Sequence, residues 1–262
     1  MENPRTHGEA PFGVAVLHGG PGAAGEVAPV ATELGRTRGT LEPFQTKLTV
    51  DGQIAELGSI LTERANLPIV LVGYSWGAML ALVFAARNPT AVKKLILVSS
   101  GALEEKSAVG ITRTRLSRMT GEQRAEFRTL SRDLQDPACR DRNAVLGRLG
   151  ALLVEVDSFD PLPHDDEIDY RYDIFESVWT EAAGLRAAGK FMEMARDIRC
   201  PVVAIHGDYD PHPAESIEGP LSGSATDRRF IILPQCGHKP WIERRAKQMF
   251  YDVLLEELGQ GL

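Results

Sequence analysis

The sequence lacks long apolar runs. No uninterrupted apolar stretch reaches the roughly 18 residues that a membrane-spanning helix requires. The N-terminal residues are polar and contain no basic segment followed by an apolar one, so we expect no secretory signal. These two absences argue against an integral membrane protein and predict that the protein has no membrane partner.

Cysteine is scarce as well. The three cysteines, Cys139, Cys200 and Cys236, are widely spaced and include no C-x-x-C pair. An odd and sparse set of this kind favours a reducing cytoplasm over a disulfide framework. We therefore expect a cytoplasmic protein in which each cysteine is a small, buried, hydrophobic side chain.

Basic residues are in the minority. The chain has 29 lysines and arginines against 36 aspartates and glutamates, which gives a net charge of −7. Nucleic-acid-binding proteins gather basic residues on one face, so this balance argues against a nucleic-acid partner. No H-E-x-x-H or comparable ligand spacing occurs, and we therefore expect no metal site.

The rest of the composition is that of an ordinary globular protein. Hydrophobic residues make up 43% of the chain and charged residues 25%, as in a typical soluble domain. A length of 262 residues fits one large domain or one domain with a sizeable insertion.

One stretch organises the chain around a serine. An apolar run over residues 69–72 predicts a buried strand, and it is followed by Gly73-Tyr74-Ser75-Trp76-Gly77 and a small, apolar helix over 77–86. A serine at the tip of a sharp strand-to-helix turn is held in a strained conformation and needs glycine on both sides. Its hydroxyl would lie at a helix N-terminus, where negative charge is stabilised. Ser75 is thus a candidate nucleophile, although the same pattern also fits a simple turn with an idle serine.

A glycine-rich loop precedes this motif. Residues 13–17 form a short apolar run that predicts a buried strand, and His18-Gly19-Gly20-Pro21-Gly22 follows directly. Such a loop is tight and pre-shaped, and it can bring backbone N–H groups close to a ligand oxygen. A plain turn between a strand and a helix would have the same composition.

Together, H-G-G-P-G and G-Y-S-W-G resemble the α/β-hydrolase fold, in particular the branch of proline iminopeptidases and related esterases. The resemblance implies a mostly parallel sheet flanked by helices. It also implies that the backbone N–H groups of Gly20 and Trp76 form an oxyanion hole, with Gly19 as the alternative donor. The family normally has two strands before the H-G loop, and only about a dozen residues precede Gly13 here. We therefore expect about six strands, with the first two family strands missing.

Between the two motifs, the sequence departs from the family. The usual D-x-x-G-x-G-x-S loop is replaced by Glu42-Pro43-Phe44-Gln45. Residues 40–44 are predicted to form an edge strand, where proline is tolerated. Helices are predicted over 28–34 and 50–65.

The middle of the chain changes character. Between residues 102 and 197, continuous apolar runs give way to arginine-rich and acidic helical patterns, and Thr120 with Gln123 predicts a capping box. A segment of this length cannot be a plain loop. We predict a hydrolase core over 1–101 and 198–262, and a helical cap over 102–197 that shapes the substrate pocket. Its charged runs are interpreted as solvated helix faces. The alternative is that Glu176, or another of the acids in this segment, binds a substrate ammonium group.

The acid and the histidine follow the last two strands. A strand over 200–206 leads to Gly207-Asp208-Tyr209-Asp210, in which the resemblance assigns the acid to Asp210; Asp208 is the alternative. A strand over 229–233 precedes the G-H-x-P-W-x-E motif, which resembles the histidine loop of the family and contains His238. An amphipathic helix over 246–258 closes the chain.

The other five histidines have structural interpretations. His7 and His164 lie in polar, loop-like stretches. His18 and His206 end strands and are predicted to be structural hydrogen-bonding groups, and His212 is placed at the rim of the site.

The order Ser75, Asp210, His238 is that of the α/β hydrolases. The sequence therefore predicts a serine hydrolase that acts on a small-molecule substrate, without a cofactor. In this hypothesis, Ser75 is the nucleophile, His238 the general base and Asp210 the orienting acid. Hydrolysis of a carboxylic ester with a small or medium acyl group is the first reading. An aminopeptidase of the proline iminopeptidase type is the second, and a non-hydrolytic ligand-binding protein is the third. The oligomeric state is left open.

Overall fold

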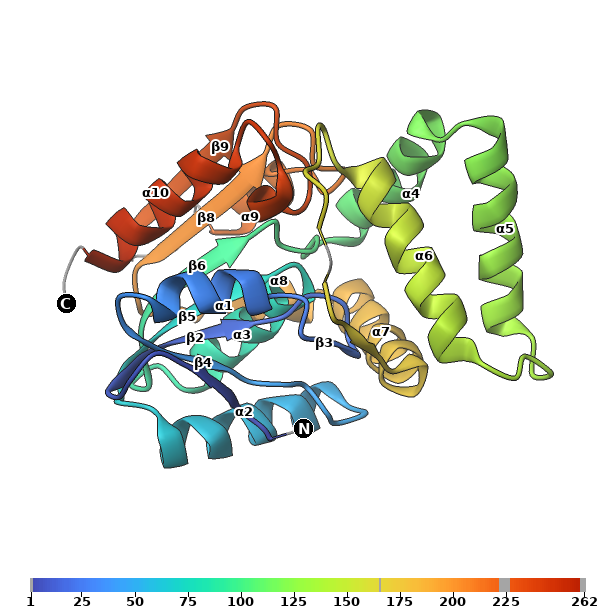
Figure 1. The fold of residues 1–262 in the computed structure, drawn as a ribbon. Helices are drawn as coiled ribbons and strands as arrows, with labels where there is room; N and C mark the ends of the chain where they lie inside the picture. Colours follow the sequence, from blue (N-terminus) through green and yellow to red (C-terminus); the bar gives the residue numbers. More distant parts are fainter. Residues whose placement is uncertain (1, 165, 222–226, 260–262) are drawn as a thin grey trace.

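A computed structural model describes residues 2–164, 166–221 and 227–259. Within these residues, a seven-stranded sheet has the strand order β1-β4-β2-β5-β6-β8-β9 (Figure 1). Neighbouring strands run parallel, except that β1 is antiparallel to β4. The strands are β1 (Arg5–His7), β2 (Phe12–Leu17), β4 (Gly39–Glu42), β5 (Ile69–Tyr74), β6 (Val92–Val98), β8 (Val202–Gly207) and β9 (Arg228–Leu233).

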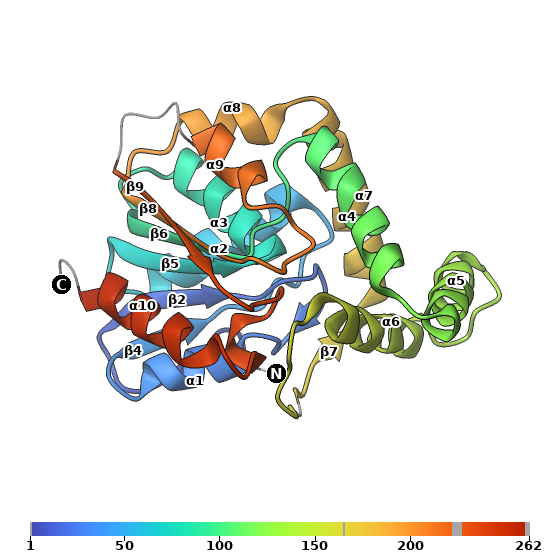
Figure 2. The same cartoon turned by 90° about the horizontal axis from the view of Figure 1, so that it is seen from above.

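Helices cover both faces of this sheet, because successive strand residues point to opposite sides. One face packs against α1 (Ala28–Gly35) and α10 (Lys247–Gly259). The other packs against α2 (Val50–Arg64), α3 (Trp76–Arg87) and α9 (Glu215–Leu221), so the sheet is the middle layer of three (Figure 2). Among the described residues, no helix combines the length and the apolar character needed to cross a membrane.

The sheet has one more strand than the sequence predicted. The strand β1 pairs with β4, so the segment near residue 40 is not the edge of the sheet. Side chains of β1 contact the buried carboxylate of Glu42, at 3.3 Å from Arg5 Nη1 and 2.8 Å from His7 Nε2. A strand of three residues that is held by polar contacts gives no hydrophobic periodicity, which is why the sequence did not indicate it.

A helical insertion occupies the chain between β6 and β8. It contains α4 (Glu105–Arg118), α5 (Gly121–Gln135), α6 (Arg142–Asp157), α7 (Tyr172–Ala187) and α8 (Lys190–Arg196). The predicted capping box is present at the start of α5, where Thr120 and Gln123 exchange side-chain and backbone hydrogen bonds. Helices α4–α6 project to one side of the sheet and share a separate apolar cluster, whereas α7 and α8 pack into the main core (Figure 1).

A small second sheet joins the insertion to the loop after β2. In it, β3 (Ala23–Ala24) pairs with β7 (Asp169–Tyr170), and the backbone N–H of Arg171 donates to the carbonyl of Gly22 at 2.8 Å. Gly22 has φ +73°, and a Cβ there would collide with the carbonyl oxygen of Arg171. The Gly-rich loop is thus fitted to the insertion backbone at a point where only glycine is accommodated.

Candidate active site

Ser75 lies at the turn between β5 and α3, with φ 51° and ψ −112°. A positive φ is costly for a residue with a Cβ, so the surrounding structure must hold it in place. A Cβ on Gly73 would collide with the carbonyl of Gly77, and a Cβ on Gly77 would collide with the carbonyl of Leu17. The two glycines of the motif are therefore required by close backbone approach, as the sequence indicated.

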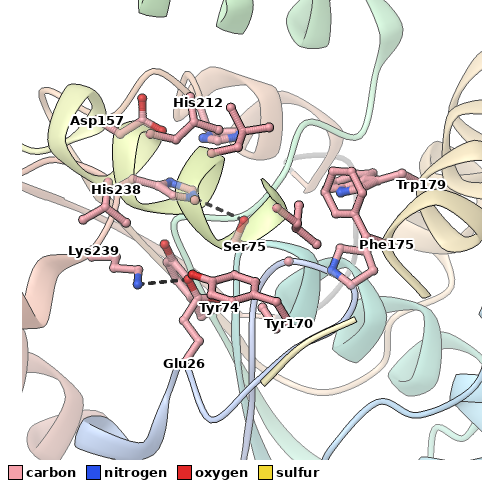
Figure 3. A pocket seen from close by; sticks show the side chains of 18 of the residues that line it. Glu26, Tyr74, Ser75, Asp157, Tyr170, Phe175, Trp179, His212, His238 and Lys239 are labelled. Atoms are coloured by element: carbon pink, nitrogen blue, oxygen red, sulfur yellow. Dashed lines mark hydrogen bonds and ion pairs between the residues drawn. The ribbon is translucent and has the colours of Figure 1, made fainter. Parts of the chain in front are cut away.

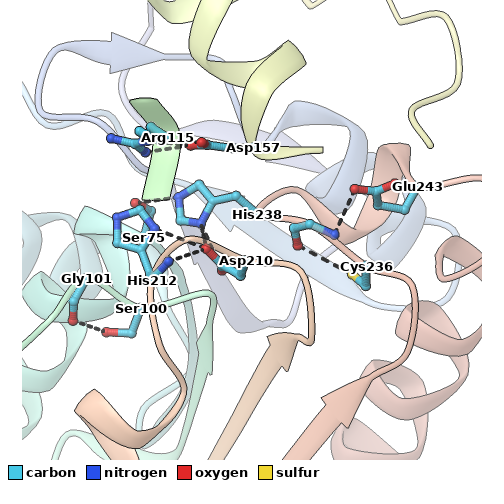
Figure 4. Close-up of polar contacts among 11 residues, drawn as sticks. Ser75, Ser100, Gly101, Arg115, Asp157, Asp210, His212, Cys236, His238 and Glu243 are labelled. Atoms are coloured by element: carbon cyan, nitrogen blue, oxygen red, sulfur yellow. Dashed lines mark hydrogen bonds and ion pairs between the residues drawn. The ribbon is translucent and has the colours of Figure 1, made fainter. Parts of the chain in front are cut away.

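Ser75, His238 and Asp210 meet at the carboxyl edge of the sheet (Figure 4). Nε2 of His238 lies 3.1 Å from Oγ of Ser75. Nδ1 of the same ring lies 3.0 Å from each carboxylate oxygen of Asp210. Because a carboxylate only accepts, Nδ1 of His238 donates, and Nε2 is left to accept the proton of the Ser75 hydroxyl.

Asp208, the alternative acid, points elsewhere. Its Oδ1 accepts a hydrogen bond from the backbone N–H of Cys236 at 3.2 Å. Asp208 therefore ties together the loops that follow β8 and β9, while Asp210 contacts the imidazole.

Asp210 is fully buried, yet it is held as a carboxylate. Burial by itself would raise the pKa of Asp210. The positive charge that His238 can carry, together with hydrogen bonds from His212 and His238, outweighs burial and holds this pKa well below its usual value. Asp210 is thus a permanent acceptor that fixes the tautomer of His238.

The two residues expected to supply oxyanion donors lie beside Ser75. Trp76 is the first residue of α3, where backbone N–H groups lack helical partners. Gly20 lines the same cavity as Ser75 and has φ +33°. The loop that carries Gly20 is fixed by His18, whose Nε2 accepts from the backbone N–H of Gln45 at 3.2 Å and whose carbonyl accepts from the Gln45 side chain at 2.9 Å.

A cavity of about 260 Å³ opens at Ser75 and His238 (Figure 3). The insertion supplies most of its wall. The residues that it contributes are mainly aliphatic or aromatic: Leu146, Leu149, Leu153, Val154, Tyr170, Phe175 and Trp179. A mostly apolar wall with a few polar groups at the reacting end is typical of a small-molecule site.

The basic side chains of this wall are paired with acids. Arg115 on α4 forms a bidentate contact with Asp157, with Nε at 2.9 Å from each carboxylate oxygen. Nζ of Lys239 lies 3.0 Å from Glu26 and 3.4 Å from Asp166. Burial by itself would lower the pKa of Lys239, but the two carboxylates outweigh it and raise this pKa, so the lysine stays charged.

Asp210, His212 and His238 also offer potential metal-ligand atoms within 4.8 Å of one another. The two imidazoles are stacked, with ring centroids 4.2 Å apart and planes at 24°. A metal ion binds in the plane of an imidazole, along the lone pair of a ring nitrogen. The lone pairs of two stacked rings lie in separate planes, so they do not converge on one ion. The arrangement therefore suits two parallel hydrogen bonds to one carboxylate better than a metal ion.

Comparison of the whole chain with known proteins decides its family. A model of the alpha/beta hydrolase family matches residues 7–251. The chain belongs to the alpha/beta hydrolase family. The resemblance inferred from the two glycine motifs is thereby confirmed at the level of the family and the fold.

Several known proteins are similar to this alpha/beta hydrolase. A proline iminopeptidase from Lactobacillus delbrueckii subsp. lactis is 25% identical over 267 residues, covering 92% of this chain and 88% of the relative. The structure of a putative lipase from Acinetobacter baumannii AYE has a TM-score of 0.64 at 17% identity, and covers 97% of this chain and 88% of that one. A proline iminopeptidase from Mycobacterium smegmatis has a TM-score of 0.62 at 18% identity, with 98% and 94% covered. At these identities, the solved structures establish the fold alone.

The predicted position of His212 in this alpha/beta hydrolase needs correction, and the alternative role considered for Glu176 is not supported. His212 was placed at the rim, but its side chain is only 11% exposed and contacts both Asp210 and the ring of His238. Its position two residues after the acid was the available signal. Glu176, considered as a ligand for an ammonium group, is exposed on α7 beside Tyr172, whereas the glutamate that lines the cavity is Glu26.

Sequence reasoning included Glu243 in the histidine-loop motif but gave it no role, whereas in the structure it holds the loop before His238 against the insertion. Its buried carboxylate accepts three backbone hydrogen bonds, each 2.8 Å long, from Phe159, Asp160 and Gly237. The first two donors follow α6 of the insertion, and the third precedes His238. One side chain thus joins the insertion to the histidine loop.

We expect Glu243→Ala to lower the free energy of unfolding by about 4 kcal/mol, because it leaves three buried N–H groups without their charged acceptor. Glu243→Gln retains one acceptor oxygen and should lose about half as much. Urea unfolding of both variants measures this difference. Glu63→Ala, on an exposed position of α2, is the matched control and should stay within about 0.5 kcal/mol of the wild type. An Ala variant that is as stable as this control would contradict the role of Glu243.

Proposed function

We propose that this alpha/beta hydrolase cleaves a carboxylic ester through an acyl-enzyme on Ser75. One observation carries the proposal: the imidazole of His238 lies between the Ser75 hydroxyl, at 3.1 Å, and the Asp210 carboxylate, at 3.0 Å. This is the geometry that a serine nucleophile, a general base and an orienting acid require.

In the first half of the proposed reaction, His238 takes the proton of Ser75 as its oxygen attacks the ester carbonyl. Asp210 stabilises the imidazolium that forms, and it stays ionised throughout. The backbone N–H groups of Gly20 and Trp76 hold the developing oxyanion. One such donor typically contributes about 3 kcal/mol to lowering the barrier.

The second half of the reaction releases the acyl group. The imidazolium of His238 first returns its proton to the leaving alkoxide, and the alcohol departs. The same imidazole then removes a proton from water, which attacks the acyl-enzyme. The imidazolium returns this proton to Oγ of Ser75 as the acid leaves, and the free enzyme is restored. These two steps require no cofactor, and their substrate is a small molecule, as we expect for a cytoplasmic enzyme of this kind.

The cavity wall supports an ester with a small or medium acyl group as the substrate. The residues that the insertion contributes to it are mainly apolar, and its basic groups, Arg115 and Lys239, are already paired with acids. A neutral, partly apolar substrate fits such a wall without leaving a buried charge unpaired.

An aminopeptidase is the second candidate, and the similarity to a proline iminopeptidase over 92% of this chain favours it. A peptidase of that kind must bind a substrate ammonium group. Glu26 is the glutamate at the cavity, but its Oε1 is engaged by Lys239 at 3.0 Å. This pairing supports the ranking of the ester first, which the sequence already favoured. Oε2 of Glu26 is buried without a hydrogen-bond partner among the described residues, and it is the oxygen that an ammonium group would have to use.

A substrate panel tests the proposal. We expect purified protein to hydrolyse p-nitrophenyl acetate, butyrate and octanoate with a higher kcat/KM than p-nitrophenyl palmitate, and to cleave proline naphthylamide far more slowly. The opposite preference would favour the aminopeptidase. A fluorophosphonate should label Ser75, as located by mass spectrometry. Labelling without turnover on either class would favour a ligand-binding protein.

A further inference from the structure

His212 makes three contacts at the centre of the site. Its backbone N–H donates to Oδ1 of Asp210 at 2.9 Å, and its ring Nδ1 lies 3.1 Å from the same oxygen. Its ring also stacks on that of His238, with centroids 4.2 Å apart (Figure 4). The reaction steps described above give these contacts no part beyond keeping Asp210 ionised.

The shared carboxylate fixes the tautomer of both rings. Asp210 only accepts, so each histidine carries a proton on Nδ1. For His238, this leaves Nε2 free to act as a base towards Ser75. For His212, it gives Asp210 a second side-chain donor, which limits rotation of the carboxylate about its own axis.

The charge state of His212 is compatible with stacking on His238, whose ring becomes cationic during the reaction. Burial and the neighbouring His238 lower the pKa of His212 to about 4, and Arg115 acts in the same direction, while Asp210 opposes them. His212 is therefore neutral at neutral pH. A neutral ring can stack on the imidazolium that forms during attack, whereas a protonated one would repel it.

We propose that His212 is a positioning residue. Its Nδ1–H holds the carboxylate of Asp210, and its ring holds the imidazole of His238 in the plane from which Nε2 reaches Ser75. The proposal rests on the proposed function, since it concerns the same reaction. The competing explanation is that His212 is only part of the cavity wall, which it also lines.

Three substitutions separate the two side-chain contacts of His212, the hydrogen bond to Asp210 and the stacking on His238. His212→Asn keeps a side-chain N–H donor and loses the stacked ring, His212→Phe keeps a flat ring and loses the donor, and His212→Ala loses both. We expect kcat for the best ester to fall about 10-fold in each of the first two variants and about 100-fold in the third, with KM near that of the wild type. His164→Ala, which removes an exposed histidine, is the control and should leave kcat unchanged.

A spectroscopic readout distinguishes positioning from a general structural role. The low-field proton resonance of the His238–Asp210 hydrogen bond should shift in His212→Phe and His212→Ala and be retained in His212→Asn. The proposal is overturned by a wild-type kcat in His212→Ala, by a change confined to KM, or by a loss of kcat that matches a loss of folded protein. A wild-type protein with neither turnover nor fluorophosphonate labelling would instead remove the proposed function.

Discussion

Ser75→Ala should lower kcat for p-nitrophenyl esters by about 10⁶-fold, down to the level of a protein that only binds the substrate. The variant removes the hydroxyl oxygen that lies 3.1 Å from Nε2 of His238. Alanine has a Cβ like serine and no larger group, so it can occupy the strained turn as serine does. Steady-state kinetics, with thermal unfolding in parallel, measures both effects.

Ser100 offers a control for Ser75. It is also buried and follows the neighbouring strand β6, but its Oγ donates to the carbonyl of Gly101 at 3.1 Å. Ser100→Ala should retain turnover and fluorophosphonate labelling, and Ser75→Ala should lose both. Turnover that persists in a folded Ser75→Ala protein would discard Ser75 as the nucleophile.

Asp210→Asn should lower kcat by about 10⁴-fold, because an amide can donate to Nδ1 of His238 and so select the wrong tautomer. The substitution keeps the size of the side chain. It removes the charge that stabilises the imidazolium during attack. The variant should remain folded, and KM should change much less than kcat.

Asp208→Asn is the matched comparison, two residues away in the same turn. Asp208 accepts from the backbone N–H of Cys236, and the amide oxygen of asparagine can do the same. We expect this variant to lose less than 10-fold in kcat, with the loss arising from small shifts of the loop. A larger loss in Asp208→Asn than in Asp210→Asn would reverse the assignment of the acid.

The parts of the site that sequence could predict are those set by local backbone chemistry. The turn at Ser75 needs glycine at 73 and 77, and this requirement is visible as G-x-S-x-G. The segments before Ser75 and Asp210 are parallel strands buried on both faces, so they could be recognised as continuous apolar runs. Parallel strands end at one edge of the sheet, but the choice of Asp210 and His238 at that edge came from the resemblance of their motifs to those of the α/β hydrolases.

The parts that could not be predicted depend on contacts between distant segments. Arg115 pairs with Asp157 across 42 positions, and Lys239 pairs with Glu26 across more than 200. Charge patterns along a helix give only neighbours three or four residues apart. Glu243 was read as part of a motif, but its role depends on backbone donors near residue 160, which no spacing rule connects to it.

The pairing of β3 with β7 bears on how a substrate could reach Ser75. The strand β3 directly follows the loop that contains Gly20, and β7 belongs to the insertion that walls the cavity. A hinge motion that moved the whole insertion away from Ser75 would separate β3 from β7. It would also release the neighbouring loop, which carries Gly20 and Gly22. We therefore expect substrate to enter without separation of β3 from β7, so that the loop carrying Gly20 keeps its place beside Ser75.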